Sequence, residues 1–423
     1  MLEFQRSHLT VLVQRLAEPA HRLVVVAGPR QVGKTTLVQA ALRHFKHGKY
    51  VSADASEEPS FVALSISRDE TMESPGVRRD ASWLVRVWQE ARRLAKQADE
   101  NGFILAIDEI QAIPQWSEVV KGLWDADRME GLDLRVVLLG SSPLLVQKGL
   151  RESLAGRFEP IPMVSHWSYP EMHDAFGLAL DDYLYFGGYP GSACWVRDEP
   201  RWRSYVRDAL IHPAISKDIL LLNRVDKPAL LSQLFQLGCE YSGQVLALSK
   251  MAPHLQDDGE KAHTLTLSHY LELMTQAGLL TGLQKYTGSK LRRRGSSPKL
   301  LVLNTAMMSL ANGADFASAR QDRTHWGRLV ESAVGAHLFN TGVPDCQLYY
   351  WSDGSDEVDF VLTRGRLLTA IEVKSGRKRA HVRGFDAFEK AFGPCRRLVV
   401  GEGGISLPEF FSFPAEHWLP EKS

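Results

Sequence analysis

The sequence predicts an α/β protein of several domains, with a parallel sheet near its N-terminus and a second α/β region at its C-terminus. Short, uninterrupted apolar runs at 23–27 and 103–107 are typical of strands that are buried on both faces of a parallel sheet. The segment 357–362 instead alternates apolar and polar residues, as a strand with one buried face does. A chain of 423 residues is long enough for about two to four domains.

The composition excludes a strongly charged surface over the whole molecule. Lys plus Arg and Asp plus Glu number 50 each, so any basic surface must be local. No apolar run approaches the roughly 18–20 residues that span a bilayer, and the N-terminus has no stretch suitable for a signal peptide. Four widely spaced cysteines form no metal-type pair, which fits a reducing compartment. We therefore expect a cytoplasmic protein with no membrane segment.

The first apolar run leads directly into a glycine-rich loop and then into a helical pattern at 36–42. Glycines allow the backbone N–H groups of such a loop to turn inward around phosphates. Lys34 adds a positive charge for the terminal phosphates, and the Thr35 hydroxyl is a ligand for Mg²⁺. A chance match in a glycine turn is the alternative, and the order strand, loop, helix argues against it. The predicted ATP-binding residues are Gly28, Pro29, Arg30, Gln31, Val32, Gly33, Lys34, Thr35 and Thr36.

The second apolar run ends in two acidic residues, Asp108 and Glu109. A P-loop needs such a partner: Asp108 is placed to hold the magnesium ion, and Glu109 to orient and deprotonate the attacking water. An acidic helix cap is the alternative interpretation. A third apolar strand at 135–139 leads to Ser141, whose hydroxyl either touches the γ-phosphate or the water, or belongs to a plain turn. Both interpretations of Ser141 stay open.

Six motifs in a fixed order extend over nearly the whole chain: GPRQVGKTT, LAIDEIQ, LLGSS, ESLAGR, FGGYP and IEVKSG. In this order they resemble the AAA-type ATPases of bacteria and archaea that carry a C-terminal nuclease-like domain of unknown function. The resemblance implies a P-loop AAA-type core with a parallel sheet over 1–165. It further implies a helical and winged-helix region over 166–312 and a restriction-endonuclease-like α/β domain over 318–423.

The resemblance also singles out one arginine. ESLAGR follows the nucleotide core, and the resemblance makes its Arg157 the candidate that senses the γ-phosphate, in cis or from a neighbouring subunit of a homo-oligomer. A surface ion pair is the alternative role, because spacing alone does not aim a side chain.

The middle of the chain combines a helical pattern with concentrated positive charge. Segments 248–255 and 264–274 are expected to be helices, and 278–283 to open a hairpin, an order typical of a winged helix that the family resemblance supports. The stretch 285–299 has six basic residues and no acidic one, which favours binding to a phosphate backbone. A solvated loop is the plainer alternative. The predicted DNA-binding residues are Lys290, Arg292, Arg293 and Arg294.

A helical pattern at 327–338 and strand patterns at 346–351, 357–362 and 368–374 predict an α/β C-terminal region. Glu372 and Lys374 share one face of their strand, and a hairpin brings Asp359 beside them. Asp359 and Glu372 can hold Mg²⁺ or Mn²⁺ together with water and a phosphate oxygen. Glu331 can complete this site, and Lys374 can stabilise the charge that develops on the phosphate.

These four residues resemble the PD-(D/E)xK nuclease superfamily. An edge hairpin with solvated charges and a surface ion pair is one alternative, and a metal site that binds DNA without cutting it is another. We therefore expect an ATP-hydrolysing, DNA-associated protein in which ATP turnover controls DNA binding or cleavage. The runner-up is an ATP-dependent switch or regulator whose C-terminal domain binds DNA or protein without cutting. A third possibility is an ATPase that acts on proteins.

Overall fold

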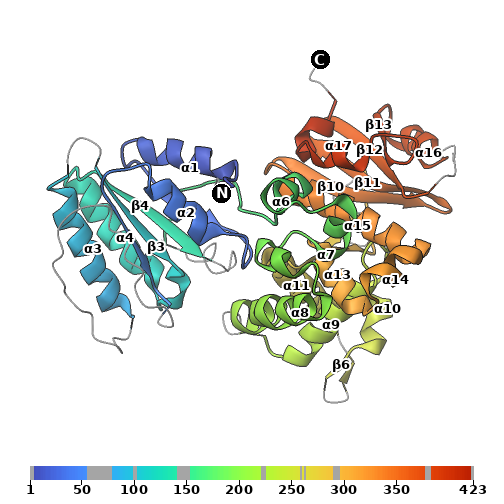
Figure 1. Cartoon of the computed structure of the whole chain (residues 1–423), viewed down its shortest axis with the longest axis horizontal. Coiled ribbons are helices and arrows are strands. Elements are labelled where there is room, and N and C mark those ends of the chain that lie inside the picture. The colour runs from blue at the N-terminus through green and yellow to red at the C-terminus, as the bar shows by residue number, and fades with distance from the viewer. Residues whose placement is uncertain are drawn as a thin grey trace. The chain divides into compact units, whose positions relative to one another are not determined.

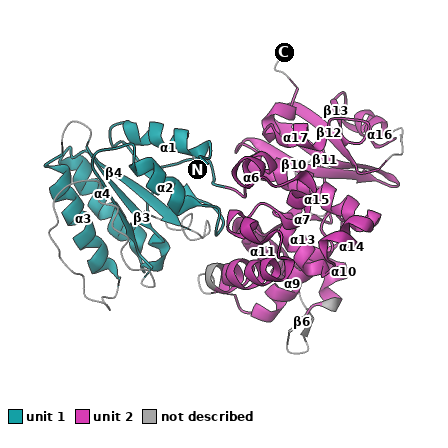
Figure 2. Ribbon diagram, viewed as in Figure 1, with its two compact units in different colours: residues 1–164 teal, residues 165–423 magenta. Residues whose placement is uncertain are grey.

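The computed structural model describes residues 4–54, 79–98, 102–140, 153–220, 225–257, 260–261, 263–288, 296–376 and 383–420 (Figure 1). The chain divides into two compact units, Met1–Val164 and Ser165–Ser423 (Figure 2). The predicted middle and C-terminal regions both fall within the second unit. No helix among the described residues is long and apolar enough to cross a membrane.

The described part of the first unit is built on a parallel sheet with the strand order β2-β3-β4-β1-β5. The predicted strand at 23–27 is β1, and the run at 103–107 extends by one residue to Asp108 as β3. In chain order the elements are α1 (His8–Ala17), β1 (Leu23–Ala27), α2 (Lys34–Leu42), β2 (Gly48–Ser52), α3 (Ala81–Ala95), β3 (Phe103–Asp108), η1 (Ile110–Ala112), α4 (Trp116–Met129), β4 (Leu134–Gly140) and β5 (Phe158–Pro160).

Both faces of this sheet are buried. Val24 and Val26 of β1 pack with α1 and α2, whereas Val25 packs on the opposite face with α3 and α4 (Figure 1). Successive strand residues point to opposite faces, so an uninterrupted apolar run is stable between two layers of helices. Because β1 and β3 are parallel members of one sheet, their carboxyl ends lie at the same edge, where the P-loop and Asp108 follow.

The first part of the second unit is mainly helical and includes a short hairpin, in which β8 and β9 pair antiparallel. The helices α10 and α11 precede this hairpin, in the order that the sequence predicts. The elements are α6 (Tyr169–Phe176), α7 (Leu180–Phe186), η2 (Pro190–Trp195), α8 (Glu199–Ser204), the π-helical η3 (Tyr205–Ile211) and η4 (Ala214–Leu220), α9 (Pro228–Glu240), α10 (Leu248–Met251), η5 (Ala252–His254), β6 (Gln256–Asp257), β7 (Glu260–Lys261), α11 (Thr264–Gln276), β8 (Leu280–Leu283), β9 (Lys299–Val302), α13 (Thr305–Asn312) and α14 (Phe316–Gln321).

The FGGYP motif forms the turn after α7 and packs against Asn304. A Cβ on Gly187 would lie 2.0 Å from the Asn304 side-chain oxygen, and one on Gly188 would lie 2.1 Å from the carbonyl oxygen of Trp167. The same Asn304 oxygen caps α13 by accepting from the backbone N–H of Ala306 at 3.1 Å. A side chain is therefore excluded at Gly187 by a helix cap and at Gly188 by the backbone of Trp167.

The chain ends in a four-stranded sheet with the order β10-β11-β12-β13, in which only the β12–β13 pair is parallel. Val330 and Val334 of α15 cover one face, and Phe388 of α16 covers the other (Figure 1). The antiparallel register pairs Phe360 with Ile371, so the residue before Phe360 and the residue after Ile371, Asp359 and Glu372, lie near each other. The elements are α15 (Arg323–Thr341), β10 (Cys346–Asp353), β11 (Asp356–Arg364), β12 (Leu367–Lys374), α16 (Arg383–Phe392), β13 (Arg396–Gly401), α17 (Leu407–Phe411) and η6 (Ala415–Trp418).

Candidate functional site

The P-loop joins β1 to α2 and closes around its own lysine. Gly28 leaves no room for a side chain, because a Cβ there would lie 2.1 Å from the carbonyl oxygen of Val164. Gly33 is the N-cap of α2 and has a φ of 87°, a conformation that glycine adopts without strain. The buried Lys34 donates from Nζ to the carbonyl oxygens of Gly28 at 3.0 Å and Pro29 at 2.7 Å. The ammonium predicted for the terminal phosphates thus lies within the loop that would bind them.

Asp108, at the end of β3, accepts hydrogen bonds from three different elements. Its Oδ2 accepts from Thr35 Oγ1 and from Tyr50 OH, each at 2.6 Å. Its Oδ1 accepts from the backbone N–H of Glu109 at 2.8 Å. Hydroxyl and carboxylate oxygens are ligands that Mg²⁺ prefers, so Thr35 and Asp108 fit the ion that a P-loop implies.

Sequence reasoning missed Tyr50. This residue belongs to β2, whose sequence carries no nucleotide-binding motif, and its hydroxyl reaches Asp108 because β2 pairs directly with β3. The register pairs Ser52 with Asp108 and Tyr50 with Ala106. Tyr50 is therefore two residues before the partner of Asp108 and lies on the same face of the sheet. Only the strand order, which the sequence does not reveal, could have identified it.

Two residues at this edge of the sheet have a backbone conformation that non-glycine residues rarely adopt. Gln31 in the P-loop has a φ of 60° and Glu109 a φ of 50°; Gln115 is the other such residue in the described chain. A left-handed conformation costs roughly 1–2 kcal/mol per residue, and such strain collects at functional sites. The Glu109 carboxylate also accepts a hydrogen bond from the side-chain amide of Gln111. The turn after β3 therefore holds Glu109 beside the acid expected to bind magnesium.

The other predicted residues of the first unit have plainer environments. Val32 is buried, and its carbonyl oxygen accepts from Nη1 of Arg6 at 3.2 Å. Arg30 is partly exposed, and Thr36 is exposed in the first turn of α2. Ser141 lies outside the described residues, so its two interpretations remain as the sequence leaves them.

Arg157 and the P-loop lie at opposite ends of the parallel strands. Arg157 precedes β5, which pairs with β1 so that Phe158 is opposite Leu23, the first residue of β1. At about 3.3 Å per strand residue, the length of β1 separates Arg157 from the P-loop by roughly 16 Å. Its guanidinium instead pairs with Asp125 of α4, with Nε–Oδ1 at 2.7 Å and Nη2–Oδ2 at 2.9 Å.

This geometry corrects one form of the expectation for Arg157. An arginine at the amino-terminal end of β1 does not reach phosphates bound at the P-loop of the same chain. A role of Arg157 as an arginine finger for its own subunit therefore does not fit this conformation. The ion pair with Asp125 is the alternative that the sequence left open. A role at the P-loop of a neighbouring subunit stays a prediction.

The hairpin of β11 and β12 brings together three of the four predicted C-terminal residues. The register pairs Phe360 with Ile371, so Asp359 on β11 and Glu372 on β12 each adjoin the last residue pair of the ladder. Asp359 Oδ2 accepts from the backbone N–H of Val373 at 2.8 Å, and Glu372 forms an ion pair with Lys374. Burial raises the pKa of Glu372 to about 7, and the neighbouring charge of Asp359 adds to this rise.

Glu331, the fourth predicted residue, is linked to this hairpin by a lysine that was not predicted to belong to the site. Lys299, the first residue of β9, is buried, and its Nζ lies 2.5 Å from Glu331 Oε1 and 3.8 Å from Asp359 Oδ1. Burial raises the pKa of Glu331 to about 7 although the lysine charge opposes this rise. Over the described ranges, no group of three or more His, Cys, Asp or Glu residues is placed so that it could hold a metal ion. Glu331, Asp359 and Glu372 therefore do not converge as a group of three ligands in the described structure. A divalent ion held by Asp359 and Glu372, with Glu331 completing the site, stays a prediction from the sequence.

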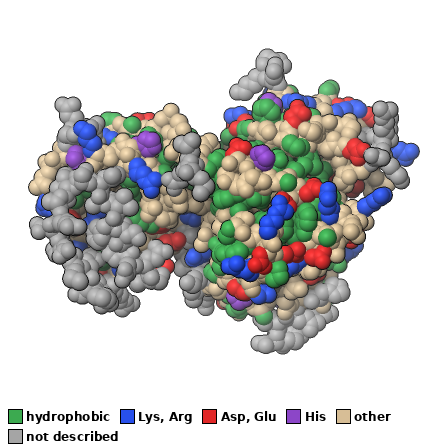
Figure 3. Space-filling view, viewed as in Figure 1, with side chains coloured by type: hydrophobic (Ala, Val, Ile, Leu, Met, Phe, Trp, Pro, Cys, Tyr) green, Lys and Arg blue, Asp and Glu red, His purple; other side chains and the backbone are tan. Residues whose placement is uncertain are grey.

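The predicted DNA-binding residues Lys290, Arg292, Arg293 and Arg294 lie outside the described residues. On the visible face of the second unit, basic and acidic side chains are interspersed (Figure 3). The structure thus leaves the expected basic hairpin tip as a prediction from the sequence.

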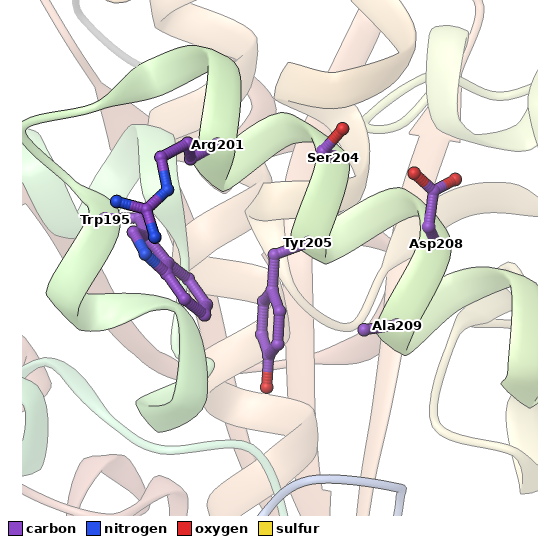
Figure 4. A pocket seen from close by; sticks show the side chains of 6 residues that line it. All are labelled: Trp195, Arg201, Ser204, Tyr205, Asp208 and Ala209. Carbon is purple, nitrogen blue, oxygen red and sulfur yellow. The ribbon is translucent and has the colours of Figure 1, made fainter.

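An open hollow of about 420 Å³ lies on α8 and η3 (Figure 4). The rings of Trp195 and Tyr205 contact each other there, with their centroids 4.4 Å apart, and Arg201 lies over Trp195 at 5.6 Å. Because the two rings touch, they leave no slot between them for a planar ligand. None of the predicted site residues lines this hollow.

Comparisons with known proteins match each part of the chain. Residues 20–172 match the family described as AAA domain, and residues 177–318 and 326–411 match two domains of unknown function, DUF8612 and DUF4143. Uncharacterized protein Rv2008c of Mycobacterium tuberculosis and uncharacterized protein Mb2031c of Mycobacterium bovis are each 29% identical over 367 residues, which are 85% of this chain and 72% of theirs. The match over residues 20–172 supports an AAA-type P-loop ATPase in the first unit.

Two solved structures also resemble the chain. The Walker-type ATPase PABY2304 of Pyrococcus abyssi is 15% identical, with a TM-score of 0.49 over 73% of this chain and 96% of that protein. A variant of RuvB from Thermotoga maritima is 16% identical, with a TM-score of 0.30 over 65% of this chain and 87% of that one.

Proposed function

We propose that this protein is an ATP-hydrolysing, DNA-associated switch, in which ATP turnover in the first unit controls DNA binding by the second. The observation that carries the ATPase part is the contact of Thr35 Oγ1 with Asp108 Oδ2 at 2.6 Å. It joins the P-loop to the acid at the end of β3 and presents two oxygen ligands at one point. A bound magnesium ion would supply charge neutralisation for the phosphates there.

The residues of the first unit divide the work of hydrolysis among them. Lys34 is a point charge for the terminal phosphates, and Thr35 and Asp108 hold the metal. Glu109 orients the attacking water and takes its proton, because it follows Asp108 in a strained turn that fixes its position. This assignment keeps the two adjacent acids in different roles.

The test of this assignment is Glu109→Gln. The amide cannot accept the proton, so ATP turnover should fall at least about tenfold while ATP binding survives. The matched control is Glu118→Gln, the same change at an exposed position in the first turn of α4. Turnover is measured by phosphate release and binding by a fluorescent ATP analogue. Equal turnover in the two variants would mean that the base lies elsewhere.

The DNA-binding part rests on the basic stretch 285–299 of the sequence, which has six basic residues and no acidic one. Replacing 292–294 by serine should weaken duplex binding equally for all sequences. It should also make the slope of log affinity against log salt shallower by up to about three, one for each lost phosphate contact. Three exposed basic residues of the same unit, replaced together, provide the control: Lys250, Arg366 and Lys390. A slope that changes equally in both triple variants would place the DNA surface elsewhere.

Metal-dependent cutting of DNA is the second candidate function. It is favoured by the pairing of β11 with β12, which brings Asp359 near Glu372, with Lys374 on the same strand as Glu372. Cutting requires that these carboxylates hold a divalent ion. The direct test is nicking of plasmid DNA with Mg²⁺ or Mn²⁺, with and without ATP.

A further inference from the structure

Lys299 is held at the centre of the C-terminal carboxylates by contacts on several sides. Its Nζ lies 2.5 Å from Glu331 Oε1 and 3.1 Å from the backbone oxygen of Asp359, to which it donates. The side-chain oxygen Oδ1 of Asp359 is 3.8 Å away, and the face of the Phe360 ring is 4.8 Å away. The lysine is only 5% exposed. Its ammonium therefore lies against two of the carboxylates, Glu331 and Asp359, that a nuclease of this type would turn toward a metal.

We infer that the Lys299 ammonium takes the place of a divalent metal ion, so that the C-terminal unit does not cut DNA by a metal-dependent route. The reason is that four of the carboxylate oxygens already have partners within the chain. Glu331 Oε1 and Asp359 Oδ1 face the ammonium, and Asp359 Oδ2 is taken by the backbone of Val373. Glu372 Oε1 is taken by Lys374.

One carboxylate oxygen of the cluster has an environment that is common for a metal ligand. Glu372 is 6% exposed, and its Oε2 is buried without a hydrogen-bond partner among the described residues. A buried carboxylate oxygen without a partner is costly, and a metal ligand is a common reason for one. Lys374 forms its ion pair with the other oxygen of Glu372, Oε1, and leaves Oε2 without a hydrogen bond.

The charges explain why a divalent ion and the lysine exclude each other. A metal ligated by Glu331 and Asp359 would lie a few ångströms from Nζ, and two positive charges in a buried site repel strongly. The lysine is tethered to β9, so it is present at a high effective concentration whatever the metal concentration is. Its withdrawal would also leave two partly buried carboxylates close to each other without a positive charge between them.

The inference deepens the proposed function, because it decides between binding and cutting, but it does not depend on ATP turnover. Its test is Mn²⁺ binding to the ATP-free full-length protein, measured by calorimetry and by the electron paramagnetic resonance signal of free Mn²⁺. We expect the wild type and Asp359→Asn to bind the same amount of Mn²⁺. Lys299→Met removes the charge while nearly keeping the volume, and it should gain one Mn²⁺ per chain. The double variant of both changes should lose that ion again.

Two further variants define the specificity of this result. Lys299→Arg keeps the positive charge and should bind no additional Mn²⁺. Lys250→Met makes the same chemical change as Lys299→Met at an exposed position of α10, and it should behave as the wild type does. A folded Lys299→Met protein that gains no Mn²⁺ would overturn the inference.

If Lys299→Met does not fold, the inference is tested by comparing Mn²⁺ binding of the wild type with that of Asp359→Asn. A Mn²⁺ ion bound by the wild type and lost in Asp359→Asn would refute the inference directly, and no difference between these two proteins would support it. ATP turnover is measured on the same preparations. Its absence from the wild type would refute the proposed ATPase function without affecting the result for Lys299.

Discussion

Replacing Glu331 by Gln should change how the stability of the second unit depends on pH. Burial raises the pKa of Glu331 from its ordinary value of about 4.5 to about 7. The folded protein therefore binds this proton more tightly than the unfolded chain does. The resulting stabilisation is fully present below about pH 4.5 and is lost as the pH rises through 7. At about 1.4 kcal/mol per pKa unit, the rise in the pKa of Glu331 stabilises the folded protein by at most roughly 3 kcal/mol.

The change is read from the difference between the two proteins. The free energy of unfolding of Glu331→Gln minus that of the wild type should rise by up to about 3 kcal/mol from pH 4.5 to 7. His337 opposes this trend in each protein alone, because burial lowers its pKa to about 4 and favours the folded state at higher pH. Its contribution is common to both proteins and cancels in the difference.

Urea unfolding at several pH values provides the measurement. The two units can unfold separately, so the transition that Mg²⁺ and ATP do not shift is assigned to the second unit. Glu272→Gln, at an exposed position of α11, is the matched control and should leave the profile parallel to that of the wild type. Parallel profiles for Glu331→Gln as well would refute the argument that Glu331 is buried beside other charges.

Three further predictions concern the first unit. Tyr50→Phe removes one of the two hydroxyl donors to Asp108 Oδ2. ATP turnover should fall at least about tenfold, because a hydrogen bond to a charged group is worth about 1.5–3 kcal/mol. Unchanged turnover and unchanged Mg²⁺ dependence in steady-state assays would contradict this. Arg157→Ala should lower turnover only at protein concentrations at which chains associate, because Arg157 is distant from its own P-loop; a loss that persists in dilute monomer would contradict this geometry. Asp127→Ala breaks the ion pair of a fully buried carboxylate with Arg92, at 2.5 Å, and should lower the free energy of unfolding by about 3–5 kcal/mol; a loss below about 1 kcal/mol in denaturant titration would be too small for a buried pair.

The sequence predicts those parts of the fold in which the residue pattern and the local motif agree. The apolar run 23–27 and the run that ends at Asp108 are β1 and β3 because a strand buried on both faces must be apolar throughout. The predicted strands 357–362 and 368–374 lie within β11 and β12. Local sequence identified them as well, because polar residues and a glycine mark the turn that joins them. Local pattern thus identified the elements that carry most of the predicted site residues.

Contacts between distant segments were not predictable from that pattern. Tyr50 reaches Asp108 through strand pairing, and Lys299 reaches Glu331 through the packing of β9 on α15. From the sequence, Lys299 belongs to a basic stretch that suggests an exposed surface, yet it is buried. A charged residue at the start of an apolar strand has the same local pattern whether it faces water or a carboxylate. The difference lies in a helix some 30 residues further along the chain.

The two acidic clusters of this protein differ in the donors that hold them, and this difference has chemical consequences. At Asp108 the donors are the hydroxyls of Thr35 and Tyr50. A hydroxyl oxygen keeps lone pairs, so Thr35 can turn from a donor to the acid into a ligand of a metal bound by that acid. At Glu331 the donor is the ammonium of Lys299, which has no lone pair while it is charged and can only compete with a metal. One cluster is therefore arranged to accept a metal ion, whereas the other is already balanced by a cation of the chain itself.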